Sequence, residues 1–475
     1  MKNLDRLFDA IGEVDEKFIP DHSEKRRITA KHRLIAAACA AAVVAGAIWI
    51  PADGGIVNQS GEAMVLAAAE YPEMEKSPEF ADYPDYQSYN EALQKWISSR
   101  NQFLSKPAGY ADGYQLFFQE TTAAFLADTG KNAVYSPLGL YIALGMTAEI
   151  TAGETQQQIL ELMGEEDISS LRPDVRALWL TNYIEDEKSK CVLGSSVWLR
   201  GGFPYHQNTV ENLANNYYSS VYSGNPASGD YSRMFQEWLS HQTDGLLDNY
   251  ISHIKLDPDM MLTLASTISY SGRWTNQFQE QKTSPGIFHG VSGDIQKDFM
   301  NAELMENYCW GEDFSSVSLR LGDNGFMRFL LPEEGVTPAQ LLGEEEVLEF
   351  MYHTSGYADC KFVEVNLSVP KFDVSSSADL REGLTSLGVT DVFEPETADF
   401  SPLTDSHGDV YLSSVQQANR VIIDEEGCKA ASYTIEMALG GALPDERVDF
   451  ILDRPFIFEL VSASGTPLFV GIVNE

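Results

Sequence analysis

The segment from Asp424 to Ala442 holds the residues whose types and spacing suggest a chemical function. It follows an apolar, β-branched run at 420–423 that is typical of a buried strand. A turn at 425–427 comes next, and small or β-branched side chains then stand at alternate positions: Ala430, Ser432, Thr434 and Ala438. Such slim side chains can enter a packed sheet, so the segment could change from a loop into a strand. The simpler interpretation is a solvent-exposed loop between two strands.

The motifs of the common catalytic machineries do not occur in the sequence. There is no GxSxG elbow, HExxH metal motif, P-loop or GxGxxG fingerprint. The eight histidines have no ligand spacing, and the acidic groups at 257–259 and 344–346 are typical of turns and solvated faces. We therefore expect no enzyme activity, no metal site and no cofactor.

The five cysteines form neither a CxxC pair nor a zinc-like spacing. From this we predict no structural disulfide, and the odd count leaves at least one thiol free. Cys428 lies at the start of the segment described above, where it is either a reactive thiol or a small apolar residue.

The composition is that of a globular chain with a strongly acidic balance. The 71 acidic and 32 basic residues give the 475-residue chain a net charge of −39. Because such a surface repels nucleic acid, we expect no nucleic-acid partner. Hydrophobic residues make up 44% of the chain, enough for a sizeable core, and the acidic excess suits solubility outside a cell.

The N-terminal region suggests a membrane anchor. Residues 1–33 are polar and end in a basic cluster, and residues 34–50 form an uncharged run. As a helix this run is about 25 Å long, the lower limit for a bilayer. The positive-inside rule then predicts a single-pass protein of the cell membrane, with a cytoplasmic segment 1–33, an anchor 34–50 and an extracellular tether 51–111 that contains a short helix. Secretion after cleavage near Ala45–Gly46–Ala47 is the alternative.

Several motifs from residue 132 onward follow the order of one known family. They are Asn132-Ala-Val-Tyr-Ser-Pro-Leu138, Ala152-Gly-Glu-Thr-Gln-Gln-Gln-Ile159, Tyr270-Ser-Gly-Arg-Trp274 and Phe450-Ile-Leu-Asp-Arg-Pro-Phe-Ile-Phe-Glu-Leu460. This series resembles the serpins, the family of suicide protease inhibitors, and we expect residues 112–475 to form one serpin domain. Together with the anchor, the resemblance suggests a membrane-anchored member of bacterial type.

The resemblance implies both a fold and a mechanism. The fold is α+β, with a large central sheet (sheet A), two smaller sheets, eight or nine surrounding helices and an exposed reactive-centre loop. The mechanism is that of a monomer that inhibits extracellular serine proteases: the protease cuts the loop, forms a covalent acyl-enzyme, and the freed segment inserts into the central sheet. A non-inhibitory member, acting as a binding or structural module, is the alternative that Lys429, Tyr433 and Glu436 favour.

The resemblance also assigns roles to residues of the loop. The hinge comprises Glu425, Glu426, Gly427, Cys428, Ala430, Ala431, Ser432 and Thr434. Alternate residues from Cys428 to Gly440 would enter the sheet, and Glu436 fits poorly because an unpaired buried carboxylate is costly. The family's distance from the hinge glutamate places the reactive bond at Gly441–Ala442, with Leu439–Gly440 and Leu443–Pro444 as alternatives. A small residue before the bond suits proteases of elastase or subtilisin type.

A second group of residues is implied to control the opening of the central sheet. We assign Ser136, Ser266, Gln417 and Trp274 to this sheet-opening region. The family usually has a serine, an asparagine and a histidine where this chain has Gly139, Ser266 and Gln417. The change predicts either a weaker latch or a polar network rebuilt around Gln417.

Overall fold

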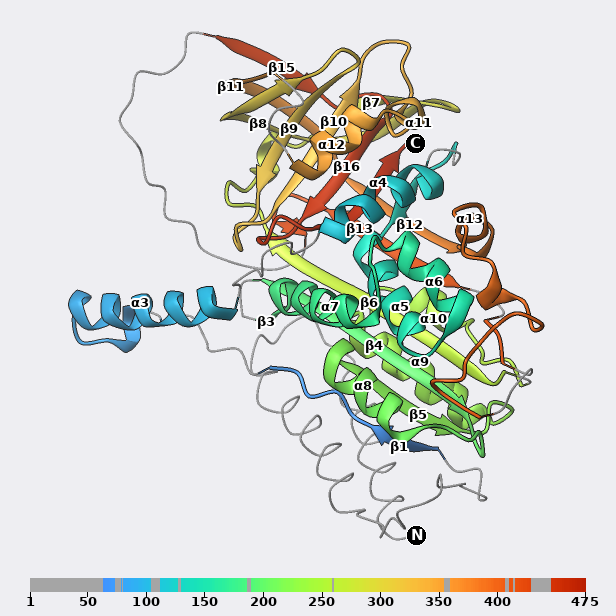
Figure 1. The fold of residues 1–475 in the computed structure, drawn as a ribbon. Helices are drawn as coiled ribbons and strands as arrows, with labels where there is room; N and C mark the ends of the chain where they lie inside the picture. The colour runs from blue at the N-terminus through green and yellow to red at the C-terminus, as the bar shows by residue number, and fades with distance from the viewer. Residues whose placement is uncertain are drawn as a thin grey trace. The chain divides into compact units, whose positions relative to one another are not determined.

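The computed structural model describes residues 63–72, 78, 80–103, 112–126, 130–185, 189–258, 260–353, 359–405, 410–412, 415–428 and 446–475 (Figure 1). These residues form eleven α-helices and three sheets of six, nine and two strands, so the expected α+β architecture is confirmed. The helices outnumber the expected eight or nine because two of them, α10 (Asp248–Ile251) and α11 (Pro338–Leu341), are single turns of four residues.

The six-stranded main sheet has the order β1, β5, β4, β6 and β14, with β3 paired to β4. Its strands are β1 Met64–Ala67, β3 Ile184–Glu185, β4 Lys190–Arg200, β5 Ser219–Gly224, β6 Leu262–Arg273 and β14 Gly427–Cys428. The inner residues of β4 are buried without a break, which means that both faces of this strand are covered.

Helices cover the main sheet on its two faces. On one face lies α5 (Pro137–Glu149), which begins after Ser136, whose side chain accepts a hydrogen bond from the backbone N–H of Gly139. On the other face lies α9 (Gly229–Gln242), where Tyr231 and Phe235 pack on Trp198 of β4. Each face of β4 therefore has its own apolar cluster.

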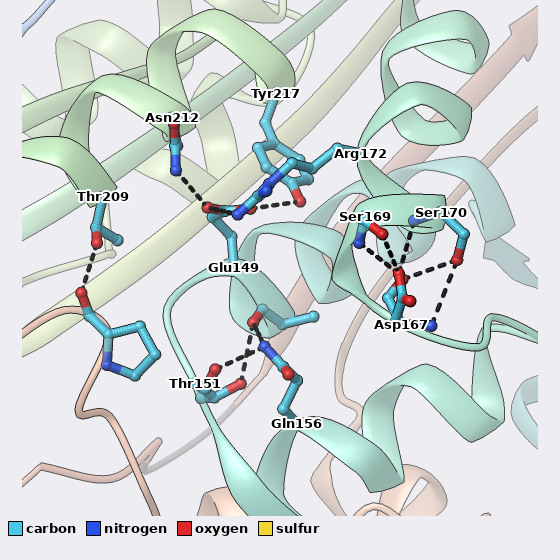
Figure 2. Close-up of polar contacts among 12 residues, drawn as sticks. Glu149, Thr151, Gln156, Asp167, Ser169, Ser170, Arg172, Thr209, Asn212 and Tyr217 are labelled. Carbon is cyan, nitrogen blue, oxygen red and sulfur yellow. Dashed lines mark hydrogen bonds and ion pairs between the residues drawn. The ribbon is translucent and has the colours of Figure 1, made fainter.

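A buried carboxylate joins three helices on the α5 side of the sheet (Figure 2). Glu149 is the last residue of α5 and is 4% exposed. It accepts two hydrogen bonds from Arg172 of α7 (Ile168–Asn182), at 2.7 and 2.8 Å. It accepts two more from Asn212 and Tyr217 of α8 (Gln207–Tyr217), at 2.9 and 3.1 Å. Because a buried charge is costly without partners, this network fixes the three helices relative to one another.

The two-stranded sheet pairs β12 (Phe372–Asp379) with β13 (Gln416–Ile423) in antiparallel register. Strand β13 leads through a short turn into β14, and β14 pairs with β6. Within the described residues no hydrogen-bonded ladder joins β13 directly to β6. The main sheet is therefore continuous with β13 only at the end where β14 lies.

The nine-stranded sheet has the order β15, β11, β8, β9, β10, β16, β17 and β2, with β7 paired to β8. Its strands are β2 Ala133–Tyr135, β7 Ser284–Gly290, β8 Gly293–Trp310, β9 Phe314–Arg320, β10 Phe326–Pro332, β11 Asp359–Pro370, β15 Arg447–Ile451, β16 Phe456–Val461 and β17 Pro467–Val473. Arg328 of β10 and Glu459 of β16 are paired residues whose side chains are both 0% exposed and form an ion pair at 2.8 Å.

A disulfide joins Cys309 of β8 to Cys360 of β11, so the prediction of no structural disulfide was wrong. The two residues are directly opposite in the antiparallel pair, with their Cα atoms 4.1 Å apart. They are 51 residues apart in the sequence, and only the pairing of the strands brings them together. The disulfide links two strands of the layer that also holds β15.

The described residues also form five further helices and three 3-10 turns. They are the helices α3 Tyr86–Phe103, α4 Asp112–Leu126, α6 Gly153–Leu162, α12 Glu345–His353 and α13 Arg381–Ser386, and the 3-10 turns η1 Phe80–Asp82, η2 Glu280–Lys282 and η3 Asp391–Phe393. Helix α3 lies in the segment for which the sequence predicted a short helix.

Part of the segment expected to be a tether packs on the main sheet. Strand β1 pairs antiparallel with β5, and the backbone N–H of Ala69 donates to the Ser220 hydroxyl at 3.1 Å. The ring of Tyr71 lies 5.2 Å from that of Trp179 and 5.8 Å from that of Tyr183. Residues 63–72 thus cover the outer edge of β5, which would otherwise be open for pairing.

The predicted membrane location is not supported. No helix in the described ranges is long and apolar enough to cross a membrane. The expected cytoplasmic segment 1–33 and anchor 34–50 lie outside the described residues. We therefore withdraw the assignment of the chain to the cell membrane, together with the extracellular and anchored character derived from it.

Candidate functional site

The turn from β13 into β14 is built by Asp424 and Gly427. The Asp424 carboxylate accepts hydrogen bonds from the backbone N–H groups of Glu426 and Gly427, at 2.9 and 3.2 Å, which closes a tight turn. Gly427 has a φ of +140°, and a Cβ atom there would lie 2.5 Å from the carbonyl oxygen of Gly272. Only glycine allows this approach of β14 to β6.

Glu425 ties this hinge to its surroundings. Its side chain is 11% exposed, with one carboxylate oxygen 2.6 Å from Lys371 Nζ and 2.7 Å from the Thr283 hydroxyl, which donates to it. Burial by itself would raise the pKa of Glu425, but the hydrogen bonds from Lys371 and Thr283 outweigh burial and hold the pKa below its ordinary value. The hinge carboxylate is therefore ionised and anchored at neutral pH.

Trp274, the residue after β6, fixes the turn from the other side. Its indole N–H donates to the carbonyl of Asp424 at 2.8 Å, and its backbone N–H donates to the carbonyl of Glu426 at 3.2 Å. The backbone N–H of Phe278 donates to the carbonyl of Glu425 at 3.1 Å. Trp274 thus belongs to the hinge, whereas the other three residues assigned to sheet opening lie around a cavity.

That cavity has a volume of about 30 Å³ and lies between β6 and β13. We call it the β6–β13 cavity. Its lining residues come from the start of α5 and its N-cap, from the connection between α9 and α10, from β6, from β13 and from β17: Ser136, Gly139, Thr243, Leu246, Leu247, Ser266, Thr267, Ile268, Ser269, Gln417, Ala418, Asn419, Arg420 and Phe469. A space of this size holds about one water molecule.

Gln417 is the centre of the polar network at the β6–β13 cavity. Its amide donates to the carbonyl of Ser136 at 2.9 Å and accepts from the backbone N–H of Ser136 at 3.1 Å. Asn419 donates to the same amide oxygen at 2.9 Å, and the Ser136 hydroxyl donates to the carbonyl of Leu468 at 2.7 Å. These hydrogen bonds form a polar network around Gln417, and its control of sheet opening stays a prediction.

The two remaining departures from the family's pattern have different consequences. At Gly139 a Cβ atom would lie 3.1 Å from the Ser136 hydroxyl oxygen and 3.6 Å from the Gln417 amide nitrogen, so the network leaves little room for a larger residue. The Ser266 hydroxyl is buried without a hydrogen-bond partner within the described part of the chain. One wall of the cavity therefore presents an unsatisfied polar group.

Most of the predicted loop residues lie outside the described residues. Of the hinge, the structure describes Glu425, Glu426, Gly427 and the backbone of Cys428, which pairs with Gly272. The residues outside are Ala430, Ala431, Ser432, Thr434, the reactive bond Gly441–Ala442, its two alternatives, and Lys429, Tyr433 and Glu436.

Sequence reasoning missed three residues that shape this site: Lys371, Thr283 and Asn419. Lys371 and Thr283 hold the hinge glutamate. The signal for Lys371 was a basic residue in a mostly acidic chain, next to the strand that pairs with β13. Asn419 has no sequence signal other than its place two residues after Gln417, on the same side of β13.

Comparisons with known proteins agree on one family. A family model described as serpin (serine protease inhibitor) matches residues 115–475. Plasminogen activator inhibitor 1 of Sus scrofa is 27% identical over 393 residues, which cover 80% of this chain and 94% of the relative. Glia-derived nexin of Mus musculus is 26% identical over 73% of this chain and 88% of the relative.

Solved structures show the same fold. The crystal structure of the thermophilic serpin tengpin in the native state superposes with a TM-score of 0.69 at 24% sequence identity, covering 78% of this chain and 95% of tengpin. At this identity the likeness establishes the fold alone.

Proposed function

Because the chain belongs to the serpin family of serine protease inhibitors, we propose that it inhibits serine proteases as a monomeric suicide substrate, with residues 112–475 as the inhibitory domain. Members of this family are for the most part inhibitors and not enzymes. The observation that carries the proposal is the hinge: β14 already pairs with β6 at the one end of the main sheet where β13 joins it.

The proposed reaction begins at the loop. The hydroxyl oxygen of the protease serine attacks the carbonyl carbon of Gly441, and the amide nitrogen of Ala442 leaves with a proton from the protease histidine. The loop N-terminal to the cut is then an ester of the protease. The N-terminal end of this loop segment is the hinge, which is continuous with β13. The freed segment can therefore extend β14 between β6 and β13, a form of strand addition for which serpin loop insertion is an established example.

The pairing of β14 supports the proposed order of inward side chains. Gly427 is opposite Arg273, so each later loop residue would move one position back along β6, and residue 434 would lie opposite Ser266. On the side of β13, the backbone N–H of Asp424 donates to the carbonyl of Gly427, so these two residues are opposite each other. Each later loop residue would then move one position back along β13, and residue 434 would lie opposite Gln417. Thr434 would thus enter the β6–β13 cavity.

The face follows from the pairing of β6 with β4. Thr263 is opposite Trp198, whose ring packs on α9, so Leu264 and Ser266 belong to the opposite, α5 face. A strand in this register would direct the small residues at 430, 432 and 434 into the core. It would also direct Glu436 there, opposite Leu264, which is the least favourable step of the insertion.

The reach and the driving force suit this mechanism. The 14 residues from Gly427 to Gly441 extend about 46 Å at roughly 3.3 Å each, close to the diameter of about 50 Å expected for such a domain. About ten new ladder hydrogen bonds at ~1 kcal/mol each would stabilise the inserted state by roughly 10 kcal/mol. The uncut form must therefore persist for kinetic reasons.

For the target we propose a protease with a shallow specificity pocket, of elastase or subtilisin type, because Gly441 presents no side chain before the cut bond. Leu439–Gly440 and Leu443–Pro444 are the alternative bonds. A proline after the bond weakens the last of these, since most serine proteases resist it.

The second candidate function is a non-inhibitory serpin whose loop is cut without trapping the protease. The inward position of Glu436 in the extended register favours it, because this carboxylate would have to lose its hydration.

The test is to mix the full chain with elastase-type, subtilisin-type and trypsin-type proteases and to analyse the products on denaturing gels. We expect an SDS-resistant complex with one of the first two enzymes, and mass spectrometry of the released C-terminal peptide should place the cut after Gly441. Cleavage without any complex would replace the inhibitor by the non-inhibitory candidate.

A further inference from the structure

The connection between α9 and α10 covers the path that an inserted strand would take. Thr243, Leu246 and Leu247 of this connection line the β6–β13 cavity opposite α5. Ladder pairing between β6 and β13 is absent from the described residues, so this connection and the polar network below it are what close the space between the strands.

The connection is attached on both sides of the cavity. On the side of β4 and β6, Lys190 Nζ lies 2.5 Å from the Asp244 carboxylate. On the side of β12 and β13, Arg420 Nη1 donates to the carbonyl of Leu246 at 2.9 Å. The Tyr250 hydroxyl forms a second bond on this side, 2.7 Å from the Ser375 hydroxyl oxygen.

Arg420 is held in place for this contact. Its guanidinium forms two hydrogen bonds with the carboxylate of Asp373 on β12, at 2.8 and 2.7 Å, and its remaining amino group points to Leu246. The planar guanidinium thereby fixes the position of a donor that crosses from β13 to the α9–α10 connection.

Insertion must break one of these attachments. A strand placed between β6 and β13 needs about 4.8 Å on each side, so the two strands must lie roughly 10 Å apart. The hydrogen bond of 2.9 Å joins Leu246 of the connection to β13, and that of 2.7 Å joins Tyr250 of α10 to β12; neither can stretch with that movement. On the α9 side, apolar packing on Trp198 adds to the ion pair between Lys190 and Asp244. We therefore expect the connection to stay attached on this side and to separate from β12 and β13.

We propose that the hydrogen bonds Arg420–Leu246 and Tyr250–Ser375 form a latch whose release limits the rate at which a strand enters the main sheet. Arg420 and Tyr250 act as positioning residues, because they hold the α9–α10 connection over the cavity through the Leu246 carbonyl and the Ser375 hydroxyl. This role rests on the proposed inhibitory function, and it would decide how often a cut loop inserts before the acyl bond is hydrolysed.

The test measures strand entry without a protease. The full chain and the variants Arg420→Met and Tyr250→Phe are incubated with a synthetic peptide of residues 429–439, and uptake is followed over time by native gel mobility and by the rise of the unfolding temperature. We expect uptake to be about tenfold faster in Arg420→Met, equivalent to roughly 1.4 kcal/mol, and about threefold or more faster in Tyr250→Phe.

Arg233→Met is the matched control. It makes the same type of substitution on α9, where the exposed Arg233 pairs with Asp230 and Glu237, and it leaves both latch bonds in place, so uptake should stay within about twofold of the unmodified chain. An acceleration equal to that of Arg420→Met would overturn the latch, because the effect would then not depend on the bond to Leu246. The latch would also be overturned if both latch variants took up the peptide at a rate within about twofold of the unmodified chain. The absence of uptake by every protein would overturn it as well.

The experiments distinguish a failure of the proposed inhibitory function from a failure of the latch. If the chain takes up the peptide but forms no complex with any protease, inhibition is contradicted while the uptake rates still decide the role of the latch. If complexes form, the latch variants should also yield a higher ratio of complex to cleaved product than the unmodified chain. A purely structural role would lower the unfolding temperature without changing this ratio.

Discussion

Lys371 Nζ and Glu425 Oε1 lie 2.6 Å apart, so the residue before β12 is bound directly to the hinge that leads into β14. The Thr283 hydroxyl donates to the same oxygen at 2.7 Å. The hinge is therefore held by two side chains from outside the main sheet, while its backbone already pairs with β6. This arrangement keeps the start of the loop at the entrance to the sheet and ready for extension.

Acidification is expected to release the hinge. The pKa of Glu425 is lowered, because hydrogen bonds from Lys371 and Thr283 outweigh the effect of burial. The stabilisation is thus complete above the ordinary glutamate pKa of about 4.3 and is lost as the pH falls through the lowered value. The lifetime of the uncut protein should shorten below about pH 4, as measured by its remaining capacity to form complexes.

Glu425→Gln is the control for this pH dependence. It lacks the titrating carboxylate, so its lifetime should already be short at neutral pH and should change less on acidification. If the unmodified chain and this variant lost activity in parallel over the whole pH range, the ion pair would not govern the hinge.

The buried pair of Arg328 and Glu459 should show a strong difference between single and double substitution. Both side chains are 0% exposed, so Arg328→Met leaves an uncompensated carboxylate and should reduce the free energy of unfolding by about 3–5 kcal/mol. Adding Glu459→Leu should restore most of this loss, as measured by urea unfolding. If the double variant were as unstable as the single variant, the ion pair would stabilise the fold by more than the neutralisation of its two buried charges.

Tyr71 should stabilise the serpin domain from outside the matched family region. Its ring packs near Trp179 and Tyr183, and β1 beside it covers the edge of β5. Tyr71→Ala should reduce the stability by roughly 1–3 kcal/mol, less than a fully buried aromatic ring would. Tyr86→Ala, at a residue that is 70% exposed, is the matched control and should leave the unfolding midpoint unchanged.

The general architecture followed from the sequence because the family motifs lie on elements that pack in or against the core, among them β2, α5, α6, β6, β15 and β16. The signature Phe450–Leu460 falls on β15 and β16, where packing restricts the residue types. The rearranged polar network shows the limit of this reasoning. The sequence located the departure at Gln417, but only the fold shows that its amide is close enough to bond Ser136 in both directions.

The disulfide and the latch could not be found in the sequence for a physical reason. Cys309 and Cys360 become neighbours through the register of β8 and β11, which no local pattern reveals. The bond from Arg420 to Leu246 joins a side chain to a backbone carbonyl 174 residues away, and a carbonyl carries no signature of residue type. Contacts of this kind depend on the packing of distant elements.

The central claim is that the cut loop becomes a strand of the main sheet in the register of β14. The most direct test compares the full chain with Thr434→Arg, incubating each with an elastase-type protease and separating the products on a denaturing gel. We predict an SDS-resistant complex for the full chain and cleavage without a complex for the variant, because an arginine at this position would have to enter the β6–β13 cavity. A complex that persists in the variant would contradict this register, and the absence of a complex with the full chain would contradict inhibition itself.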